Sequence, residues 1–558
     1  MPTSQPHEQY DVIIIGAGIS GIAMACQLKE KLNLSRFIIF EKQDGIGGIW
    51  QSHQYPGVAC DVPAPLYSYR FAPNQSWSTL TPSGREILEY LEGVCAKYNI
   101  MENIQFNTSV TALQWKDESG TAEWEVESIQ KNGMRSLTRS KIVIAAAGKF
   151  NIPRLSPLIK TPGLASFTGQ ILHTARWDPA VSLDHKNVLV VGSGCAAAQL
   201  LPALLKHSPC IKSITQLIRS PPWVSPRFLS PTGLLSEKHI LGLLRHVPGL
   251  AGIVRMVMLA FLESEYFRFY GSRSNWFSRI WRWWRERLFL GFMRRSVARE
   301  YWGILEPGYQ VGCKRVVQDS GWFGCLADGR VRLVTGGIKR VECDVVVLGS
   351  DSDDAGGEEG TRECRIPTDV IILATGYETD TLLDSISIAG RDSIALQEIW
   401  KERGGPQAYL GIAMDHFPNL FFVSGPNSSV GHTTVLIGIE HSVSYIVKLI
   451  GNVLDGRAST VEVKEEACRR WTEMVQDASR ESVWIAGGCR NWYVDGRRWN
   501  SMIYPFSQIY AIYTYAFPRW EDWTVNQTHT SGMGSIRKLL NIGALLLGTV
   551  LIMIYISQ

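Results

Sequence analysis

Two glycine-rich segments, each directly after a short apolar run, restrict the fold of this chain most. The run Asp11–Ile15 leads into GAGISG at residues 16–21, and the run Asn187–Val191 leads into GSGCAA at residues 192–197. Apolar runs rich in β-branched residues predict buried strands. A glycine-rich turn between a strand and a helix lets the backbone and the helix N-terminus approach a pyrophosphate. The chain is therefore predicted to be an α/β protein with two Rossmann-like dinucleotide-binding domains.

The residue after the second strand of each unit predicts which nucleotide the unit binds. In the first unit, Glu41 directly follows the run Phe37–Phe40 and lies about 20 residues after the glycines. A carboxylate at this position is expected to bind ribose hydroxyls. In the second unit, Arg219 follows the run Ile214–Ile218, and a guanidinium suits the 2′-phosphate of NADPH. Ala197 occupies the third glycine position of this unit, which serves helix–strand packing and accepts alanine. The first unit is therefore predicted to bind FAD or NAD, and the second NADPH.

Length, charge and cysteine usage narrow the class of protein. The 558 residues suggest roughly three or four domain-sized units, and a formal net charge of +4 is too small to indicate a nucleic-acid partner. The 11 Cys include no CxxC pair, so neither a zinc site nor a disulfide framework is predicted. We therefore expect reduced thiols and a body that faces the cytosol. No metal site is expected, and the polar N-terminus predicts no signal peptide.

The C-terminal end differs in composition from the rest of the chain. Residues 539–556 carry no charge, and as a helix they would extend ~27 Å, close to the hydrocarbon thickness of a bilayer. Arg537 and Lys538 precede this segment and, by the positive-inside tendency, stay in the cytosol. The pattern predicts a single-pass tail anchor, expected in the endoplasmic reticulum, after a flexible tether at residues 528–538. The alternative is a buried terminal helix, although no segment follows to cover its far side.

Two longer motifs match a known family of flavoenzymes. Residues 47–61 read GGIWQSHQYPGVACD, and residues 167–178 read FTGQILHTARWD. Together they resemble the two signatures of the type I Baeyer–Villiger monooxygenases, and the resemblance extends over most of residues 11–520. The run FPNLF…GPN…GH at residues 417–432 resembles fungal monooxygenases of this kind. The matching fixed positions are Gly47, Gly48, Trp50, Tyr55, Pro56, Gly57 and Asp61 in the first signature and Phe167, Gly169, His173, Trp177 and Asp178 in the second.

The resemblance implies a reaction and its cofactors. In this family NADPH reduces FAD, reduced FAD activates O₂, and one oxygen atom is inserted next to a ketone carbonyl to give an ester or a lactone. The segment VGCKRVVQD at residues 311–319 places Arg315 at the position of the family's catalytic arginine, although Val316 replaces the usual proline. A guanidinium suits an anionic oxygen species because it stays protonated. Asp61 is expected to hold Arg315 through a charge-assisted pair.

The same resemblance indicates which residues bind the two nucleotides. Val110 is expected near the adenine of FAD, and Trp492 near the nicotinamide nucleotide. His173 and Asp178 are expected to couple domain movement to NADPH binding rather than to transfer protons. The expected cofactor contacts are, in the first unit and the segment after it, Gly16, Gly18, Ser20, Gly21, Glu41, Gly48, Ile49, Trp50, Cys60, Asp61, Tyr67 and Val110, and in the second unit and beyond it, Gly192, Ser193, Gly194, Cys195, Ala196, Ala197, Ala198, Gln199, Arg219, Ser220 and Trp492.

The order of the motifs predicts a chain that passes twice through each nucleotide-binding domain. A helical insertion at residues 226–310 interrupts the NADPH-binding domain and is dense in Trp and Arg at residues 276–285. It is expected either to cover the substrate site or to form a membrane-interfacial face. Residues 349–360, GSDSDDAGGEEG, predict a disordered surface loop. The predicted segments are 1–150 and 377–527 for FAD binding, 151–225 and 311–376 for NADPH binding, 226–310 for the helical insertion, 528–538 for the tether and 539–556 for the transmembrane helix.

Three functions remain open at this stage. The first is a Baeyer–Villiger monooxygenase acting on a ketone, and the second is a flavin monooxygenase that oxidises nitrogen or sulfur or hydroxylates. The third is a catalytically silent membrane flavoprotein that serves as a scaffold. Trp177 with Asp178, and Asp61 with Arg315, argue against the second function, while the intact glycines, Glu41 and Arg315 argue against the third. The aromatic-rich insertion and the apolar tail suggest a lipophilic substrate, and the fungal resemblance suggests secondary metabolism.

Overall fold

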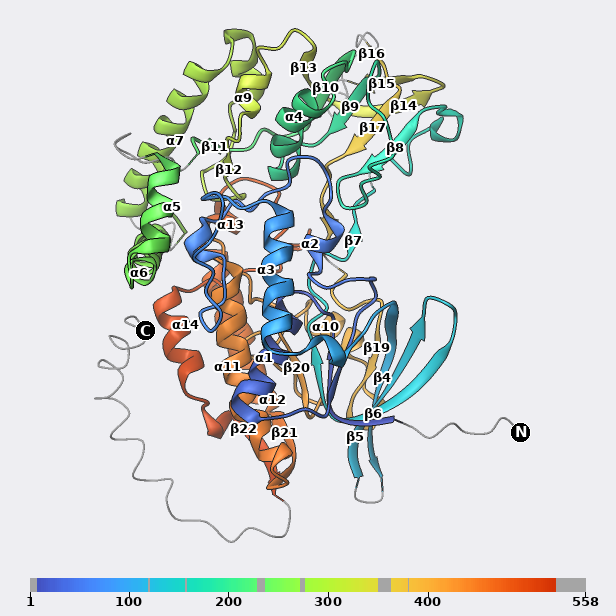
Figure 1. The fold of residues 1–558 in the computed structure, drawn as a ribbon, viewed down its shortest axis with the longest axis vertical. Helices are drawn as coiled ribbons and strands as arrows, with labels where there is room; N and C mark the ends of the chain where they lie inside the picture. Colours follow the sequence, from blue (N-terminus) through green and yellow to red (C-terminus); the bar gives the residue numbers. More distant parts are fainter. Residues whose placement is uncertain are drawn as a thin grey trace.

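The computed structural model describes residues 8–118, 121–155, 158–227, 236–270, 276–349, 363–379 and 381–527. Within these residues the chain forms two lobes, each built on a sheet with parallel strands, and a row of helices along one edge (Figure 1). The N-terminal and C-terminal parts of the chain share one lobe, whereas the middle part forms the other lobe and the row of helices.

The first lobe contains an eight-stranded sheet flanked by helices. Its elements are β1 (Glu8–Ile15), α1 (Ile19–Leu32), β2 (Phe37–Phe40), α2 (Ile49–Ser52), α3 (Gly84–Lys97), β3 (Ile104–Gln105), β4 (Thr108–Glu118), β5 (Thr121–Gln130), β6 (Arg135–Ala145), β19 (Ser387–Ala389), α10 (Leu396–Glu402), β20 (Leu420–Phe422), α11 (Val435–Leu454), β21 (Ala458–Val463), α12 (Glu465–Arg480), α13 (Val483–Ala486), α14 (Gln508–Ala516) and β22 (Trp523–Gln527). The strand order is β19-β4-β5-β6-β1-β2-β3, with β20 paired in parallel to β6. The returning chain therefore completes the sheet that the N-terminal segment begins.

The second lobe contains a five-stranded parallel sheet of order β13-β10-β9-β17-β8 and a three-stranded antiparallel sheet of order β14-β15-β16. Its elements are β7 (Ile152–Pro153), β8 (Gln170–His173), β9 (Asn187–Val191), α4 (Cys195–His207), β10 (Ser213–Ile218), β11 (Val224–Ser225), β12 (Val317–Gln318), α9 (Trp322–Cys325), β13 (Val331–Thr335), β14 (Gly337–Glu342), β15 (Val345–Gly349), β16 (Cys364–Pro367), β17 (Val370–Leu373) and β18 (Tyr377–Glu378). The antiparallel sheet is inserted between β13 and β17, the strand that returns to the centre.

The apolar runs that the sequence predicts as strands form central parallel strands of both sheets. Ile13 and Ile14 of β1 and Leu189 and Val190 of β9 have no exposed surface. Burial on both faces is the reason these strands read as continuous apolar runs rather than as alternating patterns. The α/β class with Rossmann-like sheets is therefore confirmed.

The row of helices at the edge consists of α5 (Glu237–His246), α6 (Leu250–Glu265), the π-helical turn η4 (Tyr266–Tyr270), α7 (Trp276–Ser296) and α8 (Trp302–Leu305). None of the helices in the described part of the chain is long and apolar enough to span a bilayer. The predicted tether at 528–538 and tail anchor at 539–556 lie outside the described residues, as does the predicted acidic loop beyond residue 349.

Candidate active site

The first glycine-rich turn has the backbone and the acid that a dinucleotide needs. Gly16 has a φ of +102°, and a Cβ there would lie 2.8 Å from the carbonyl oxygen of Ala146, so the turn requires glycine. The Ala17 N–H donates to Glu41 Oε2 at 2.7 Å, which fixes the buried carboxylate beside the turn. This arrangement fits the pyrophosphate and the ribose of FAD.

The GGIW segment packs directly on this turn. A Cβ on Gly48 would lie 3.1 Å from Gly18 Cα, so glycines at both positions allow the two backbones to touch. Trp50, on α2 next to Ile49, donates from Nε1 to Tyr67 Oη at 3.0 Å. Burial raises the pKa of Tyr67 well above its ordinary value, so the phenol remains protonated. The segment therefore forms a rigid wall beside the predicted FAD site.

Two further predicted FAD contacts lie at the edges of this site. Ser20 Oγ is 2.9 Å from Ser424 Oγ, which links α1 to the segment after β20. Val110 lies on β4 two residues after Thr108, whose N–H donates to the Glu41 carbonyl at 2.8 Å. Val110 is therefore close to Glu41, with its side chain buried in the core of the lobe.

Asp61 and Arg315 form a two-pronged ion pair. Arg315 Nε donates to Asp61 Oδ2 and Arg315 Nη2 to Asp61 Oδ1, each at 2.7 Å. Gln318 Nε2 donates to the Asp61 carbonyl at 2.8 Å, and Cys195 Sγ of the second glycine-rich turn lies 3.8 Å from Asp61 Oδ2. The pair thus lies where the segment after the first turn meets the second turn. The structure brings together the two catalytic residues that the sequence predicts, although 254 positions separate them.

The electrostatics of this pair keep both groups charged. Burial would raise the Asp61 pKa, but the positive charge and the hydrogen bonds of Arg315 outweigh burial and lower it. The Asp61 charge, against a smaller effect of burial, raises the pKa of Arg315 well above its ordinary value. Arg315 is therefore a permanent cation, and its Nη1 group has no hydrogen-bond partner among the described residues.

A disulfide braces the loop that carries Arg315, which corrects the expectation of reduced thiols. Cys313 and Cys489 are bonded, while the other nine Cys are free. Asn491 Nδ2 adds a hydrogen bond to the Cys313 carbonyl at 3.1 Å. The expectation was wrong at this pair because the two Cys are 176 residues apart, and sequence spacing alone does not indicate such a contact. The bridge ties the Arg315 loop to the segment that contains Trp492.

The second glycine-rich turn repeats the geometry of the first. Gly192 has a φ of +133°, and a Cβ there would lie 2.5 Å from the Ala374 carbonyl oxygen. Ser193 Oγ donates to the Ser220 carbonyl at 2.9 Å, which joins the turn to the end of β10. Gly194 precedes α4, where Ala197 and Ala198 are buried beneath the turn and Ala196 is half-buried. These residues therefore shape the turn through packing and a backbone contact.

Gln199 connects the two lobes. Its Oε1 accepts from the Tyr55 hydroxyl at 2.9 Å, and its Nε2 donates to the Ala59 carbonyl at 2.9 Å. Both ends of the amide are thus used between α4 and the segment of residues 55–59. The side chain therefore joins the two lobes, and its contact with NADPH stays a prediction.

Two cations lie at the end of β10, of which the sequence predicted one. Arg219 is exposed, and Lys314 Nζ donates to Ser220 Oγ at 2.8 Å. Burial, with the charge of Arg219 as a smaller cause, lowers the pKa of Lys314, which shows that the two groups are neighbours. Together they fit a dianionic 2′-phosphate. The sequence analysis missed Lys314, and the signal that could have indicated it is its position directly before Arg315.

Aromatic side chains line the space between the lobes. The Trp492 ring lies 5.3 Å from Phe150, and Phe150 lies 5.4 Å from Tyr377. His53 Nε2 lies 2.6 Å from Tyr377 Oη, and burial lowers the pKa of His53 to about 4, so this imidazole is neutral. His173 is also buried, and burial lowers its pKa. Neutral imidazoles here match linker or packing roles rather than proton donation.

Lys149 is a further residue that the sequence did not indicate. Its Nζ donates to Ser428 Oγ at 3.3 Å, Ser429 Oγ at 3.0 Å and the Met502 carbonyl at 3.4 Å. Burial lowers its pKa to about 7. Among the described residues Lys149 has no acidic partner, and with this pKa it is only partly protonated near neutral pH.

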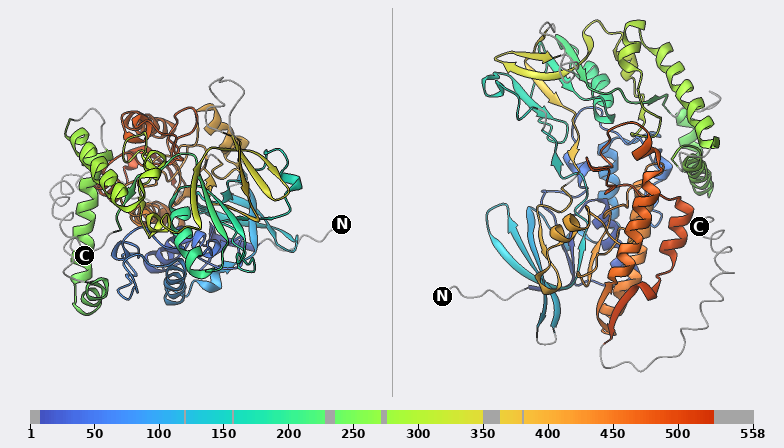
Figure 2. Two further views of the ribbon diagram at one scale, coloured as in Figure 1. Left: turned by 90° about the horizontal axis from the view of Figure 1, so that it is seen from above. Right: turned by 180° about the vertical axis from the view of Figure 1, so that it is seen from behind.

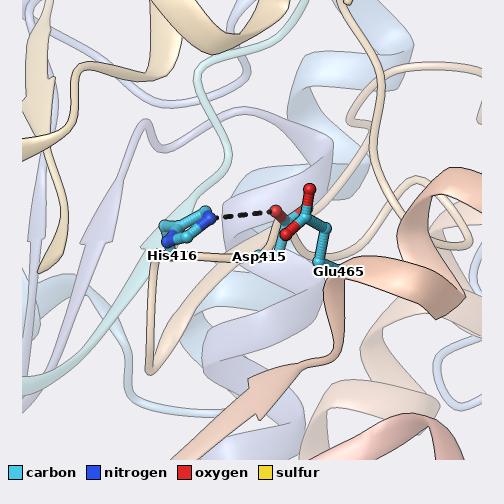
Figure 3. Close-up of side chains that lie close together, drawn as sticks. All are labelled: Asp415, His416 and Glu465. Carbon is cyan, nitrogen blue, oxygen red and sulfur yellow. Dashed lines mark ion pairs between the residues drawn. The ribbon is translucent and has the colours of Figure 1, made fainter.

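A separate cluster of Asp415, His416 and Glu465 has oxygen and nitrogen atoms close together (Figure 3). His416 Nε2 lies 3.5 Å from Asp415 Oδ2. Arg403 donates to both Asp415 oxygens at 2.8 and 2.7 Å and to Glu465 at 3.2 Å. Arg469 Nε also donates to Glu465 at 2.7 Å, so each acid already pairs with an Arg, and this cluster is an ion-pair network rather than a built metal site.

Comparisons with known proteins agree with this geometry. The sequence model of the flavin-binding monooxygenase-like family matches residues 9–229. A Baeyer–Villiger monooxygenase of Pseudomonas aeruginosa is 30% identical over 508 residues, which are 90% of this chain and 89% of the relative. The FAD-binding monooxygenase ktnD of Aspergillus niger is 30% identical over 503 residues, 86% of this chain and 76% of the relative. The crystal structure of cyclohexanone monooxygenase from Rhodococcus sp. Phi1 bound to NADP+ has a TM-score of 0.76 at 22% identity, with 94% of this chain and 100% of that chain covered.

The fold and the site define a flavin monooxygenase with two nucleotide-binding units. The chain belongs to the type I Baeyer–Villiger monooxygenase family. It is an NADPH-dependent enzyme, and its cofactors are FAD and NADPH. A catalytically silent scaffold is therefore set aside.

Proposed function

We propose that this enzyme inserts one oxygen atom from O₂ next to the carbonyl of a lipophilic ketone, giving an ester or a lactone. The observation that carries the proposal is the Asp61–Arg315 pair, held where the segment after the first glycine-rich turn meets the second turn. A fixed cation at this place suits a reaction in which negative charge develops on oxygen. Bound FAD would supply the activated oxygen, and bound NADPH the hydride that reduces the flavin.

The chain's own residues orient the guanidinium of Arg315 and stabilise an anionic oxygen. Arg315 directs Nε and Nη2 to Asp61, which leaves Nη1 to donate to an anionic oxygen. Since Asp61 raises the pKa of Arg315, this donor does not lose its proton to a basic oxygen. Asp61 is a positioning residue, because a displaced guanidinium would misplace the stabilising charge. Arg219 and Lys314 would hold the 2′-phosphate of NADPH.

Aromatic packing near Arg315 supports an apolar substrate. Tyr270 of η4 stacks on Trp484 with ring centroids 5.5 Å apart, and it lies 5.9 Å from His432. A Cβ on Gly312, in the Arg315 loop, would lie 3.3 Å from the Tyr270 ring. The loop therefore adjoins a wall of aromatic rings, a type of lining that is common in sites for apolar ligands.

The test is product analysis with the purified, FAD-loaded enzyme. A panel of lipophilic cyclic ketones is supplied with NADPH and O₂, and a matched panel of amines and sulfides serves as the comparison. The proposal expects esters or lactones in proportion to NADPH consumed. Oxidation of the amines or sulfides, with no ester or lactone from any ketone, would overturn it in favour of heteroatom oxygenation.

The proposal includes attachment to a membrane through residues 539–556, with the body in the cytosol and the endoplasmic reticulum as the expected membrane. Eighteen uncharged residues preceded by Arg537 and Lys538 support it. Removal of residues 539–558 should abolish carbonate-resistant membrane association while bound FAD is retained. Loss of FAD from the truncated protein would show instead that the tail belongs to the folded core.

A role in fungal secondary metabolism is the last part of the proposal. It is supported by the run at residues 417–432 and by the Aspergillus niger relative. Deletion of the gene in its source should lead to accumulation of a ketone and loss of the corresponding ester or lactone. An unchanged metabolite profile would contradict this role without affecting the reaction assigned to the purified enzyme.

A further inference from the structure

Helix α7 presents a stripe of large apolar side chains to the outside. Trp276 is 70% exposed, Ile280 50% and Trp284 55%, and Leu288 continues the stripe at 58%. These residues recur every four positions, so they share one face of the helix. All four Trp that are exposed in the described part of the chain, Trp276, Trp281, Trp283 and Trp284, lie on α7.

The opposite face of α7 explains why these rings point outward. Ser278 Oγ donates to the Phe267 carbonyl at 2.9 Å, and Arg282 Nη1 donates to the Phe269 carbonyl at 3.0 Å. These carbonyls belong to the π-helical turn η4. Because polar residues of α7 are needed on this inner side, the aromatic side chains are left on the outer side.

Two neighbouring helices also expose apolar side chains. On α6, Ile253, Val257 and Phe261 are exposed at the same four-residue spacing. On α14, Ile509 and Tyr513 are exposed, and Phe517 follows the helix. Glu263 of α6 accepts from the Gln508 N–H at 3.0 Å, which joins α6 to the start of α14. The two views in Figure 2 agree with Figure 1 that these helices lie along one edge of the molecule.

The exposed charges on α6, α7 and α14 have a single sign. The exposed charged residues of α7 are all Arg, whereas Glu286 is half-buried and accepts from the Val311 N–H at 3.0 Å. Arg287 lies 4.3 Å above the Trp283 ring, and Arg268 lies 4.9 Å above the Trp281 ring. The two acids of α6 are buried, and α14 contains no charged residue. We call the exposed apolar and Arg residues of α6, α7 and α14 the aromatic surface.

We propose that the aromatic surface docks on the anionic face of a lipid bilayer, with the Trp rings in the headgroup layer and the Arg side chains on lipid phosphates. Trp and Tyr favour this layer, and helices with apolar and basic residues lie in its plane. This inference goes beyond the proposed reaction and stands independently of it.

The charges favour lipid over two other occupants. A second copy of the chain packed by two-fold symmetry would place Arg-rich surfaces against each other. The predicted tail, residues 539–556, has no acidic group to pair with the Arg residues. Anionic headgroups supply both an apolar layer and the missing negative charge.

The aromatic surface also adjoins a hollow of about 740 Å³. Trp283 and Arg287 form one side of this hollow, and Gln310 and Gly487 form another. Gln310 and Gly487 lie close in sequence to the disulfide that braces the Arg315 loop. A body docked in this orientation would therefore place the loop region of the active site near the bilayer, where a lipophilic ketone concentrates.

The test uses the full-length, FAD-loaded protein in vesicles that contain brominated phosphatidylcholine, with or without phosphatidylglycerol. Brominated acyl chains quench Trp fluorescence only on close approach, and residues 528–558 contain no Trp, so the signal reports on the body alone. Quenching is expected with phosphatidylglycerol. The double variant Trp276→Ser/Trp284→Ser should lose about half of it, because two of the four exposed Trp are removed.

Matched variants separate lipid contact from general damage. Trp115→Phe removes a Trp that is buried in β4 and should leave quenching unchanged. Arg279→Gln should weaken docking about fivefold in vesicles with phosphatidylglycerol and have little effect without it. Arg480→Gln, at the end of α12, serves as the exposed control. Every variant must retain bound FAD.

Two outcomes overturn the proposal. The first is quenching that is absent in the wild-type protein, or that is equal in the wild-type and Trp276→Ser/Trp284→Ser proteins. The second is absent quenching together with cross-links between α7 helices of two copies, which would identify a dimer interface. Failure of ketone oxygenation, by contrast, would contradict only the proposed reaction and not the docking of the aromatic surface.

Discussion

The two glycine-rich turns have the same backbone but neighbours of opposite charge. Gly18 before α1 has φ and ψ of −77° and −175°, and Gly194 before α4 has −78° and −175°. Beside the first turn lies the buried carboxylate of Glu41, whereas beside the second lie Arg219 and Lys314. The backbone suits a pyrophosphate in both units, and we expect the strand-end side chain to select the nucleotide. We therefore expect selection between FAD and NADPH to depend on a few side chains rather than on the fold.

The largest effect is expected at Arg315, which belongs to neither turn. Arg315→Ala should lower ester or lactone formation by about 10²–10³-fold, because the charge that stabilises the anionic oxygen is lost. FAD content and NADPH binding should persist. The measurement is product formed per NADPH oxidised, with Arg330→Ala, another Arg in an ion pair with Asp, as the matched control. Product at a near wild-type rate would show that Arg315 is not the stabilising group.

The acid of the first turn should affect FAD alone. Glu41→Ala removes the acceptor of the Ala17 N–H and the expected ribose partner. Loss of a hydrogen bond to a charged group costs ~1.5–3 kcal/mol, so FAD affinity should fall roughly ten- to hundredfold. Titration of the apoprotein with FAD, followed by flavin fluorescence, gives the affinity. An equal loss of NADPH affinity would contradict the division of roles between the turns.

The cations of the second turn should affect NADPH alone. Arg219→Ala should raise the KM for NADPH by roughly tenfold or more and leave the KM for NADH almost unchanged. Lys314→Gln should have a smaller effect in the same direction, because Lys314 also donates to Ser220. Arg332→Ala on β13 is the matched exposed control. If the substitutions raise the KM for NADPH and the KM for NADH equally, these cations do not bind the 2′-phosphate.

The smallest effect concerns Lys149, at the connection between the two units. Its pKa in the folded protein is about 7, below the ordinary 10.5, so between these values the unfolded chain binds more protons. Stability of the wild-type protein should therefore gain from this group as pH rises through that window. Lys149→Met should remove this part of the pH dependence, as measured by the melting temperature of the FAD-loaded protein. Lys141→Met, on the exposed side of β6, is the control, and identical pH slopes for wild type and Lys149→Met would contradict the argument.

Elements that depend on neighbouring residues could be predicted closely. β2 and β9 begin and end at the residues that the apolar runs indicate. Each run is short, apolar except for Asn187 at the start of β9, and followed by a glycine-rich turn or a charged strand end, so local sequence contains the whole signal. The Asp61–Arg315 pair was also anticipated, but through family motifs, because no local rule links residues so far apart.

The sequence by itself determined the two βαβ units, their glycine turns and the charged residues that we expect to distinguish FAD from NADPH. Only the tertiary structure decided which distant groups meet: the Cys313–Cys489 disulfide, the burial of Lys149 and the use of Gln199 between the lobes. It also resolved which way the Trp-rich helix faces, since the π-helical turn takes the hydrogen bonds of Ser278 and Arg282. The physical reason is that burial and pairing depend on neighbours brought together by folding, whereas strand and turn formation depend on the few residues next to each other along the chain.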